Sequence, residues 1–197
     1  MSKATLENYV LDDKCLTILD SALQAFSAYG FKKTSMDDIA KGAGMSRPAL
    51  YLHFQNKEAI LRQLTHLHYE RKTAAVAEAL NMEGSVSQII GNAIHVQTDG
   101  MAEIMSSPHG LELLDASVST AADIVTQGEA QLMALYADWL RREAEKGRVR
   151  LFDGPRETAK MIASALRGIK TSASDYQEFI RSNSNLATVI GAGIEVT

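Results

Sequence analysis

Two helix starts separated by a glycine-containing break, between residues 35 and 54, most restrict what this chain can fold into. Ser35 is a serine N-cap with an acidic residue, Asp38, three positions later, and such a pair satisfies two backbone N–H groups at a helix start. The helix it opens is short, because Gly42-Ala43-Gly44 interrupts it. Ser46 is a second N-cap, and Pro48 falls in the first turn after it, where its missing N–H costs nothing. The pattern predicts two short helices joined by a tight turn.

A helix-turn-helix has this arrangement. Its first helix must bury a short apolar face, here Ile39 and Ala40. Its second helix must pack through one side, here Leu50, and leave the opposite side free for the major groove of DNA. The spacing therefore predicts a helix-turn-helix within residues 34–61.

The remaining sequence favours helices throughout. The spacing of apolar residues by three and four predicts a helix over residues 12–29, and a helix starting at Asn56 continues towards Leu80. Only three prolines occur, and no stretch shows the alternation of a strand. The stripe of the first helix consists of Leu16, Leu19, Ala22, Leu23 and Phe26. Further helices are predicted at about 85–106, 111–122, 124–146, 156–172 and 176–191, so the fold class is all-α.

Charge and cysteine content narrow the class of protein. The net charge is −4, but residues 1–80 hold ten Lys/Arg against nine Asp/Glu and the remainder holds ten against fifteen, so a polyanion meets least repulsion at the N-terminal part. Cys15 is the single cysteine, which excludes an intramolecular disulfide and predicts no metal site and no other cofactor. Residues 1–8 lack a signal-peptide pattern, and no apolar run reaches the roughly 18 residues that span a bilayer. We expect a cytoplasmic protein without a membrane partner.

Enzyme signatures are missing from the sequence. It contains no GxSxG, Walker-type loop or HExxH motif. His66 and His68 stand two positions apart on a predicted helix, so their rings diverge and do not form a metal pair. The adjacent Asp37 and Asp38 fit the preference of helix N-termini for acidic residues. The chain is not expected to be an enzyme.

The stretch TSMDDIAKGAGMSRPALYLHFQNKEAIL, residues 34–61, resembles the tetracycline-repressor (TetR) family of bacterial regulators. The elements that carry the resemblance are Thr34, the Ala-x-x-Ala-Gly of residues 40–44, Ser46, the Tyr-x-x-Phe of residues 51–54 and residues 57–61. The preceding helix also matches, so the resemblance covers about residues 13–62. It implies an N-terminal three-helix helix-turn-helix DNA-binding domain at 1–57, a connecting fourth helix at about 56–80, and a C-terminal helical ligand-binding and dimerisation domain at 81–197.

The same resemblance and the side-chain chemistry predict the residues that contact DNA. The resemblance implies that Thr34, Tyr51 and Lys57 hold the phosphate backbone. Arg47 and His53 have the reach to touch bases or phosphates, and Ala49 fits a thymine methyl. Instead of contacting DNA, Tyr51 could serve mainly to pack the domain and His53 could lie on a solvated surface. The full predicted set is Lys33, Thr34, Ser46, Arg47, Pro48, Ala49, Tyr51, His53 and Lys57.

For the C-terminal part the resemblance implies a dimer interface on the last two helices and a ligand pocket between the middle ones. The alternative for every such residue is packing in the subunit's own core. The interface candidates are Ile162, Leu166, Ile169, Phe179, Leu186 and Ile190. The pocket candidates are Ile94, Met101, Met105, Leu113, Met133, Tyr136 and Trp139, with His95, Gln97, Asp99 and His109 as candidate polar anchors.

The sequence thus predicts a ligand-responsive transcriptional repressor. It binds a palindromic operator in double-stranded DNA as a homodimer, and a small-molecule effector releases it. The alternative is an architectural or activating helix-turn-helix protein without effector-driven release.

Overall fold

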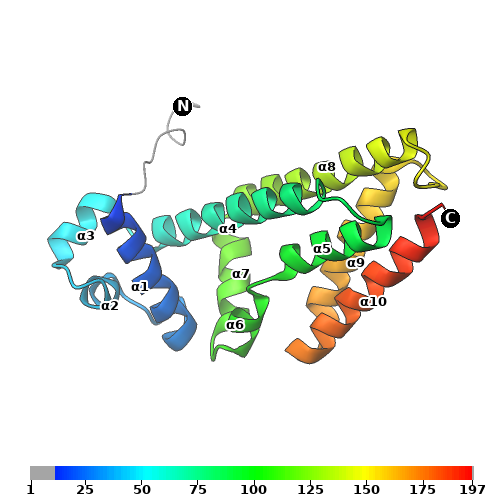
Figure 1. Ribbon diagram of the computed structural model, residues 1–197. Helices are drawn as coiled ribbons and strands as arrows, with labels where there is room; N and C mark the ends of the chain where they lie inside the picture. Colours follow the sequence, from blue (N-terminus) through cyan, green and yellow to red (C-terminus); the bar gives the residue numbers. More distant parts are fainter. Residues whose placement is uncertain (1–11, 197) are drawn as a thin grey trace. The chain divides into compact units, whose positions relative to one another are not determined.

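The computed structural model describes residues 12–196, which form ten α-helices and no strand (Figure 1). The all-α prediction is confirmed. The expectation for residues 1–8 and the first eleven residues of the predicted DNA-binding domain lie outside the described part.

The helices form two compact units. The N-terminal unit takes the chain up to Leu64 together with Ser107–Thr120, and the C-terminal unit takes Thr65–Ser106 and the chain from Ala121 onwards. The predicted division at residue 81 therefore differs from the observed one. A segment from the middle of the chain joins the N-terminal helices, and the helix α4 (Lys57–Ala79) belongs in part to each unit.

The N-terminal unit is built on α1 (Asp13–Tyr29), α2 (Met36–Gly42), α3 (Arg47–His53) and α7 (Gly110–Thr120). Asp12 caps the start of α1, and Gly30 caps its end with a φ of 87°, a conformation that L side chains rarely adopt. The predicted stripe on α1 was wrong at Leu16 and Leu23, which are both 40% exposed. Leu19, Ala22 and Phe26 are buried as predicted, and the other buried residues of α1 are Cys15, Ile18, Ser21 and Ala25.

Two hydrogen bonds join the start of α7 to the end of α1 and to the loop that follows it. The backbone N–H of His109 donates to the carbonyl of Ser27 at 3.2 Å, and Glu112 Oε1 accepts from the backbone N–H of Lys32 at 3.3 Å. Both contacts link residues about eighty positions apart in sequence, which is why a local pattern did not predict them.

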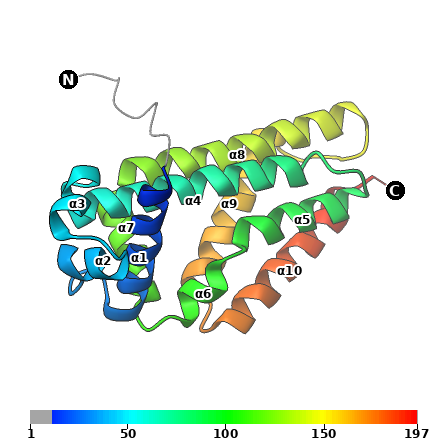
Figure 2. The same ribbon diagram turned by 60° about the vertical axis from the view of Figure 1, so that its left-hand side comes forward.

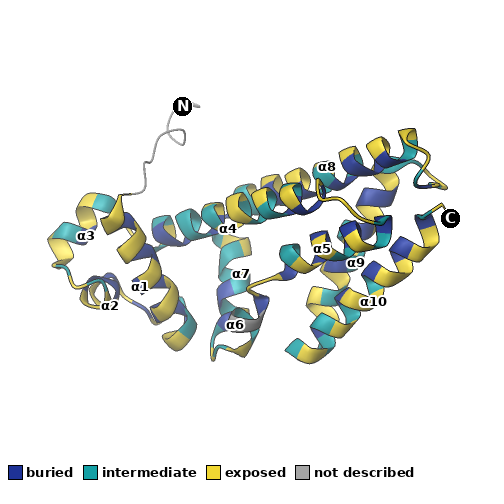
Figure 3. Cartoon of the chain, viewed as in Figure 1, coloured by how far each residue is buried: buried dark blue, intermediate teal, exposed yellow. Residues whose placement is uncertain are grey.

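The C-terminal unit consists of α5 (Val86–Thr98), α6 (Met101–Ser106), α8 (Ala122–Glu145), α9 (Pro155–Ser172), α10 (Tyr176–Ile194) and the later part of α4. Its helix α5 lies beside α10 in both views (Figures 1 and 2). The two come so close that a Cβ added to Gly191 would lie 2.8 Å from Ser87 Cα. One face of each helix is buried and the other exposed (Figure 3). The core includes Ile90, Trp139, Leu140, Ala159 and Ile162.

One predicted helix of this unit is divided in two. The pattern predicted a helix over 85–106, but α5 ends at Thr98 and α6 begins at Met101. Gly100 has a φ of 76°, and its N–H donates to Asp99 Oδ1 at 2.9 Å, so a local turn replaces the helical hydrogen bond. Among the described residues, no helix has the length and apolar character needed to cross a membrane.

Candidate nucleic-acid interface

The first helix of the motif, α2, begins with the predicted capping box. Ser35 Oγ accepts from the backbone N–H of Asp38 at 3.2 Å, and Asp38 Oδ2 accepts from that of Ser35 at 2.9 Å. Hydrogen bonds from Ser35 also lower the pKa of Asp38, because they stabilise the charged carboxylate. After α2 the chain turns at Gly44, whose φ of 66° is the left-handed conformation that the tight turn requires.

The second helix, α3, has one buried and one exposed face. Ser46 caps it by accepting from the backbone N–H of Ala49, and Leu50 is completely buried. The side that faces away from Leu50 carries exposed side chains, among them Leu52, which is 86% exposed. The exposed residues of α3, called here the outer face of α3, are Arg47, Pro48, Tyr51 and Leu52.

Arg47 is positioned by two neighbours on this surface. One guanidinium nitrogen donates to Asp37 Oδ2 at 3.1 Å and another donates to the Tyr51 hydroxyl at 3.3 Å. The guanidinium carbon lies 5.5 Å from the centre of the Tyr51 ring, within the range of a cation–π contact. Arg47 and Tyr51 are thus held together with their polar atoms accessible, as base or phosphate contacts require.

Thr34 is turned into the protein. It is 2% exposed, and its hydroxyl donates to the carbonyls of Gly30 at 2.8 Å and Ala25 at 3.2 Å. The side chain therefore fixes the end of α1. The predicted phosphate contact of this hydroxyl is not what the structure shows, since its proton is used inside the unit.

Lys57 is likewise engaged within the unit. Its ammonium donates to the carbonyls of Phe31 at 2.7 Å, Lys32 at 3.0 Å and Thr34 at 2.9 Å, and it lies 4.8 Å from the centre of the Phe31 ring. All three protons of the ammonium are occupied, which leaves none for a phosphate. The geometry gives Lys57 the role of holding the loop between α1 and α2, whereas Lys33 in that loop is exposed.

His53 and Ala49 are half-buried and lie beside a hollow between α1 and α3. The hollow has a volume of about 320 Å³. His53 Nδ1 is 3.4 Å from Cys15 Sγ, a contact between the last residue of α3 and the first turn of α1. The residues that line the hollow are Lys14, Thr17, Ala43, Gly44, Met45, Ala49, Leu52 and His53.

The predicted ligand-pocket residues are mostly core residues. Leu113 is buried in the N-terminal unit, and Ile94, Met101, Tyr136 and Trp139 are buried in the C-terminal unit. Met105 and Met133 are half-buried. One polar pair lies among them, since the buried Tyr136 hydroxyl donates to Gln97 Oε1 at 2.8 Å and burial raises its pKa.

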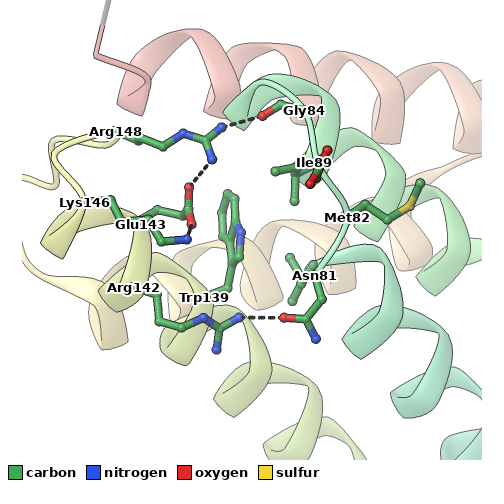
Figure 4. A pocket seen from close by; sticks show the side chains of 11 residues that line it. Asn81, Met82, Gly84, Ile89, Trp139, Arg142, Glu143, Lys146 and Arg148 are labelled. Carbon is green, nitrogen blue, oxygen red and sulfur yellow. Dashed lines mark hydrogen bonds and ion pairs between the residues drawn. The ribbon is translucent and has the colours of Figure 1, made fainter.

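A polar hollow of about 260 Å³ lies where the turn after α4 meets the end of α8 (Figure 4). Glu143 is buried there between Lys146 and Arg148, each with a nitrogen 2.8 Å from one of its carboxylate oxygens. Arg148 also donates to the carbonyl of Gly84, and Arg142 donates to Asn81 at 3.2 Å. These bonds tie the two segments together. Among the predicted pocket residues, Trp139 lines this hollow.

Four of the six predicted dimer residues are buried in a single copy of the chain. These are Ile162, Leu166, Phe179 and Ile190, while Ile169 and Leu186 are half-buried. Buried side chains offer little area to a partner. The same two helices expose Met161 and Val189, at 56% and 69%.

Comparison with known proteins agrees with this geometry. Residues 18–64 match the family model described as bacterial regulatory proteins, tetR family. The HTH-type transcriptional repressor Rv1474c of Mycobacterium tuberculosis is 32% identical over 133 residues, which cover 68% of this chain and 67% of the relative. The HTH-type transcriptional regulator EthR of Mycolicibacterium smegmatis is 45% identical over 53 residues, or 27% of this chain and 24% of EthR.

Solved structures share the fold along most of the chain. SmeT, the repressor of the Stenotrophomonas maltophilia multidrug efflux pump SmeDEF, aligns with a TM-score of 0.70 at 19% identity over 92% of this chain and 90% of SmeT. A transcriptional regulator from Cytophaga hutchinsonii aligns with a TM-score of 0.77 at 18% identity over 94% of this chain and all of that one.

The capped α2, the turn at Gly44 and the exposed outer face of α3 define a helix-turn-helix transcriptional regulator. Family membership follows from the match to Rv1474c and from the matched motif: the chain belongs to the TetR family of bacterial regulatory proteins, as its sequence predicted. The matched proteins are regulators, which agrees with the expectation that this chain is not an enzyme.

Proposed function

We propose that this protein is a transcriptional repressor that binds a palindromic operator as a homodimer and that a small-molecule effector releases it. The outer face of α3 carries the proposal, because it exposes Arg47, Pro48, Tyr51 and Leu52 while Leu50 holds the helix in the core. The relative Rv1474c and the structural neighbour SmeT are both named repressors, which supports repression rather than activation for this chain.

In this proposal α3 enters the major groove of DNA. Arg47 has the donors to pair with guanine, and the exposed Leu52 supplies an apolar contact of the kind that reads a thymine methyl. Tyr51 reaches a phosphate through its hydroxyl, and Ser46 caps the helix while its own hydroxyl proton remains available for a phosphate. Lys33 adds a positive charge from the loop before α2.

The dimer is proposed to form through the exposed faces of α9 and α10. A single helix-turn-helix reads few base pairs, so a second copy on the other half-site supplies affinity and specificity. Met161 on α9 and Val189 on α10 are large apolar side chains that one copy leaves exposed. Met161 and Val189 form the centre of the proposed interface, in place of the buried residues that the sequence predicted there. Ile169 and Leu186 are proposed to lie at its edges.

The effector is proposed to bind in the C-terminal unit near Tyr136, Gln97 and Met133. The structural neighbour SmeT has been solved in complex with triclosan, a small molecule. The Tyr136–Gln97 hydrogen bond supplies polar groups within an apolar core, and the thioether of Met133 repacks easily around a ligand. The helix α4 runs through both units, and it is one covalent link by which such binding would shift the DNA-binding unit.

The test begins with selection of genomic fragments by the purified full-length chain, followed by fluorescence-anisotropy titration of the recovered sequence. We expect sequence-specific binding of two chains per palindrome. Tyr51→Phe should weaken binding several-fold on all sequences alike, because it removes one phosphate contact. Binding without sequence preference would favour the architectural alternative.

Repression and release need their own measurement. The protein should silence a reporter gene placed behind the recovered operator. A compound from a small-molecule screen should restore expression of the reporter and should dissociate the protein from the operator DNA. Two outcomes would contradict this part of the proposal. In the first, the protein activates the reporter; in the second, compounds bind the protein but none of them releases it from the operator.

A further inference from the structure

Three side chains with metal-binding atoms meet in the N-terminal unit. Asp12 caps α1, Cys15 lies in its first turn and His53 is the last residue of α3. One carboxylate oxygen of Asp12, the Cys15 sulfur and one imidazole nitrogen of His53 all lie within 4.8 Å of one another. Cys15 is 2% exposed, so its sulfur is shielded, while Asp12 is exposed and His53 is half-buried.

The separation of Cys15 and His53 matches that of two ligands on one tetrahedral ion. Zinc binds sulfur at about 2.3 Å and imidazole nitrogen at about 2.0 Å, so two such ligands on one ion stand about 3.5 Å apart. Cys15 Sγ and His53 Nδ1 are 3.4 Å apart. Asp12 Oδ1 accepts from the backbone N–H of Cys15 at 2.7 Å, and a carboxylate has a second oxygen for a metal.

The thiol of Cys15 must lose its proton before its sulfur can bind a metal ion. In the free protein burial raises the pKa of Cys15 to about 11, so at neutral pH the residue is a protonated thiol and a poor nucleophile. The metal–thiolate bond has to offset the cost of removing that proton, so metal affinity at this site should rise with pH.

We propose that Asp12, Cys15 and His53 bind one Zn²⁺ ion, which links the start of α1 to the end of α3. The Cys15 thiol loses its proton to solvent as the Zn–S bond forms, and water completes the four ligands. The sequence predicted no metal site, because Cys15 is its single cysteine and His66 and His68 do not form a metal pair. Asp12 and Cys15 stand three positions apart in the sequence, but only the fold brings His53 to them.

The site would also tune DNA binding, a consequence that rests on the proposed function. The ion would fix the last residue of α3 against α1 and so restrict the motion of the DNA-reading helix. Binding Zn²⁺ with release of one proton raises the charge of the site by one, which favours approach of a polyanion. Both effects strengthen operator binding, and they make His53 a metal ligand rather than a DNA contact.

The experiment uses the purified full-length protein, stripped of metal and titrated with Co²⁺ as a spectroscopic replacement for Zn²⁺. We expect one equivalent to bind with a thiolate-to-cobalt charge-transfer band and tetrahedral visible bands, both removed by Zn²⁺. Cys15→Ser should abolish the charge-transfer band, and His53→Ala and Asp12→Asn should weaken binding at least tenfold. His66→Ala, which removes an imidazole outside the cluster, should leave binding unchanged.

Circular dichroism would establish that each variant is folded. His53→Ala and Asp12→Asn keep the test decisive if Cys15→Ser disturbs the core. The proposal is overturned if the charge-transfer band is absent, or if His53→Ala binds Co²⁺ as tightly as the wild type. In parallel, Zn²⁺ should raise operator affinity several-fold in the wild type and not in His53→Ala. Failure of the metal-free protein to bind any DNA would instead contradict the proposed function and leave the cobalt result standing.

Discussion

Arg47 on α3 donates a hydrogen bond to the carboxylate of Asp37 on α2, 3.1 Å away, across the turn of the helix-turn-helix. The two side chains are 58% and 60% exposed, and an ion pair this exposed contributes at most about 1 kcal/mol to stability. A base or phosphate can therefore replace Asp37 as the partner of Arg47 at little cost. The pair keeps the guanidinium near the outer face of α3 before DNA arrives.

Arg47→Ala should lower operator affinity and change which operator variants are preferred. A guanidinium that contacts a base edge contributes about 1–3 kcal/mol of discrimination, so the loss should concentrate at one or two base pairs. The measurement is anisotropy titration against single-base operator variants. Asp37→Asn is the companion variant, expected to raise affinity several-fold at low salt because it removes a competing negative charge. An unchanged preference in Arg47→Ala would make Arg47 a backbone contact only.

Lys57→Met should destabilise the protein without changing the number of phosphate contacts. The ammonium donates to three carbonyls of the loop between α1 and α2, and the loss of charged hydrogen bonds costs about 1–3 kcal/mol. Thermal unfolding measures that cost. The slope of log affinity against log salt should match the wild type, since a lost phosphate contact lowers it by about one.

Lys33→Met is the matched control, because Lys33 is exposed on the same loop. It should leave the unfolding temperature unchanged and reduce the salt slope by about one. The reverse pattern, with a stable Lys57→Met variant of reduced slope, would restore the phosphate contact that the sequence predicted for Lys57.

Lys57 and Thr34 also show where prediction from sequence stops. The caps at Ser35 and Ser46, the turn at Gly44 and the all-α class follow from local hydrogen bonding and spacing, and they were predicted. Which way a polar side chain turns depends on groups brought from elsewhere, such as the loop carbonyls that occupy the Lys57 ammonium.

Apolar spacing has a related limit. It identifies the face of a helix that avoids water but not the surface that covers it. Ile162 and Ile190 satisfied the pattern expected of a dimer interface, yet both belong to the core of one copy. The contact between Cys15 and His53, 38 positions apart, had no local signal at all.

Gly128→Ala should destabilise the C-terminal unit, because α8 and α4 approach closely at Gly128 and Tyr69. A Cβ added to Gly128 would overlap the Tyr69 ring and lie 2.8 Å from its Cβ. Overpacking costs about 1–3 kcal/mol and the gain in helix propensity returns up to about 1 kcal/mol, so urea denaturation should show a net loss of roughly 1–2 kcal/mol.

Gly91→Ala on α5 supplies the control for this substitution. Its added Cβ meets no atom within 4 Å, so it should be neutral or stabilising by up to about 1 kcal/mol. In a Tyr69→Ala background, Gly128→Ala should lose its penalty. A penalty that persists there would assign the effect to the backbone of α8 rather than to contact with Tyr69.

Lys72→Met should stabilise the protein at neutral pH. Burial, together with the charge of Lys170, lowers the pKa of Lys72 from 10.5 to about 8. As pH falls from 10.5 to 8, the unfolded chain takes up a proton at Lys72 before the folded chain does. The stability of the folded protein therefore decreases through this range and then stays low.

The Lys72 side chain is half-buried, and the loss of stability below pH 8 amounts to about 1–3 kcal/mol. Urea denaturation at pH 7 should therefore show a gain for Lys72→Met that disappears by pH 10.5, and no gain for Lys72→Arg, which keeps the charge. A lower stability of Lys72→Met at pH 7 would mean that the ammonium is stabilised by a partner and that burial does not control its charge.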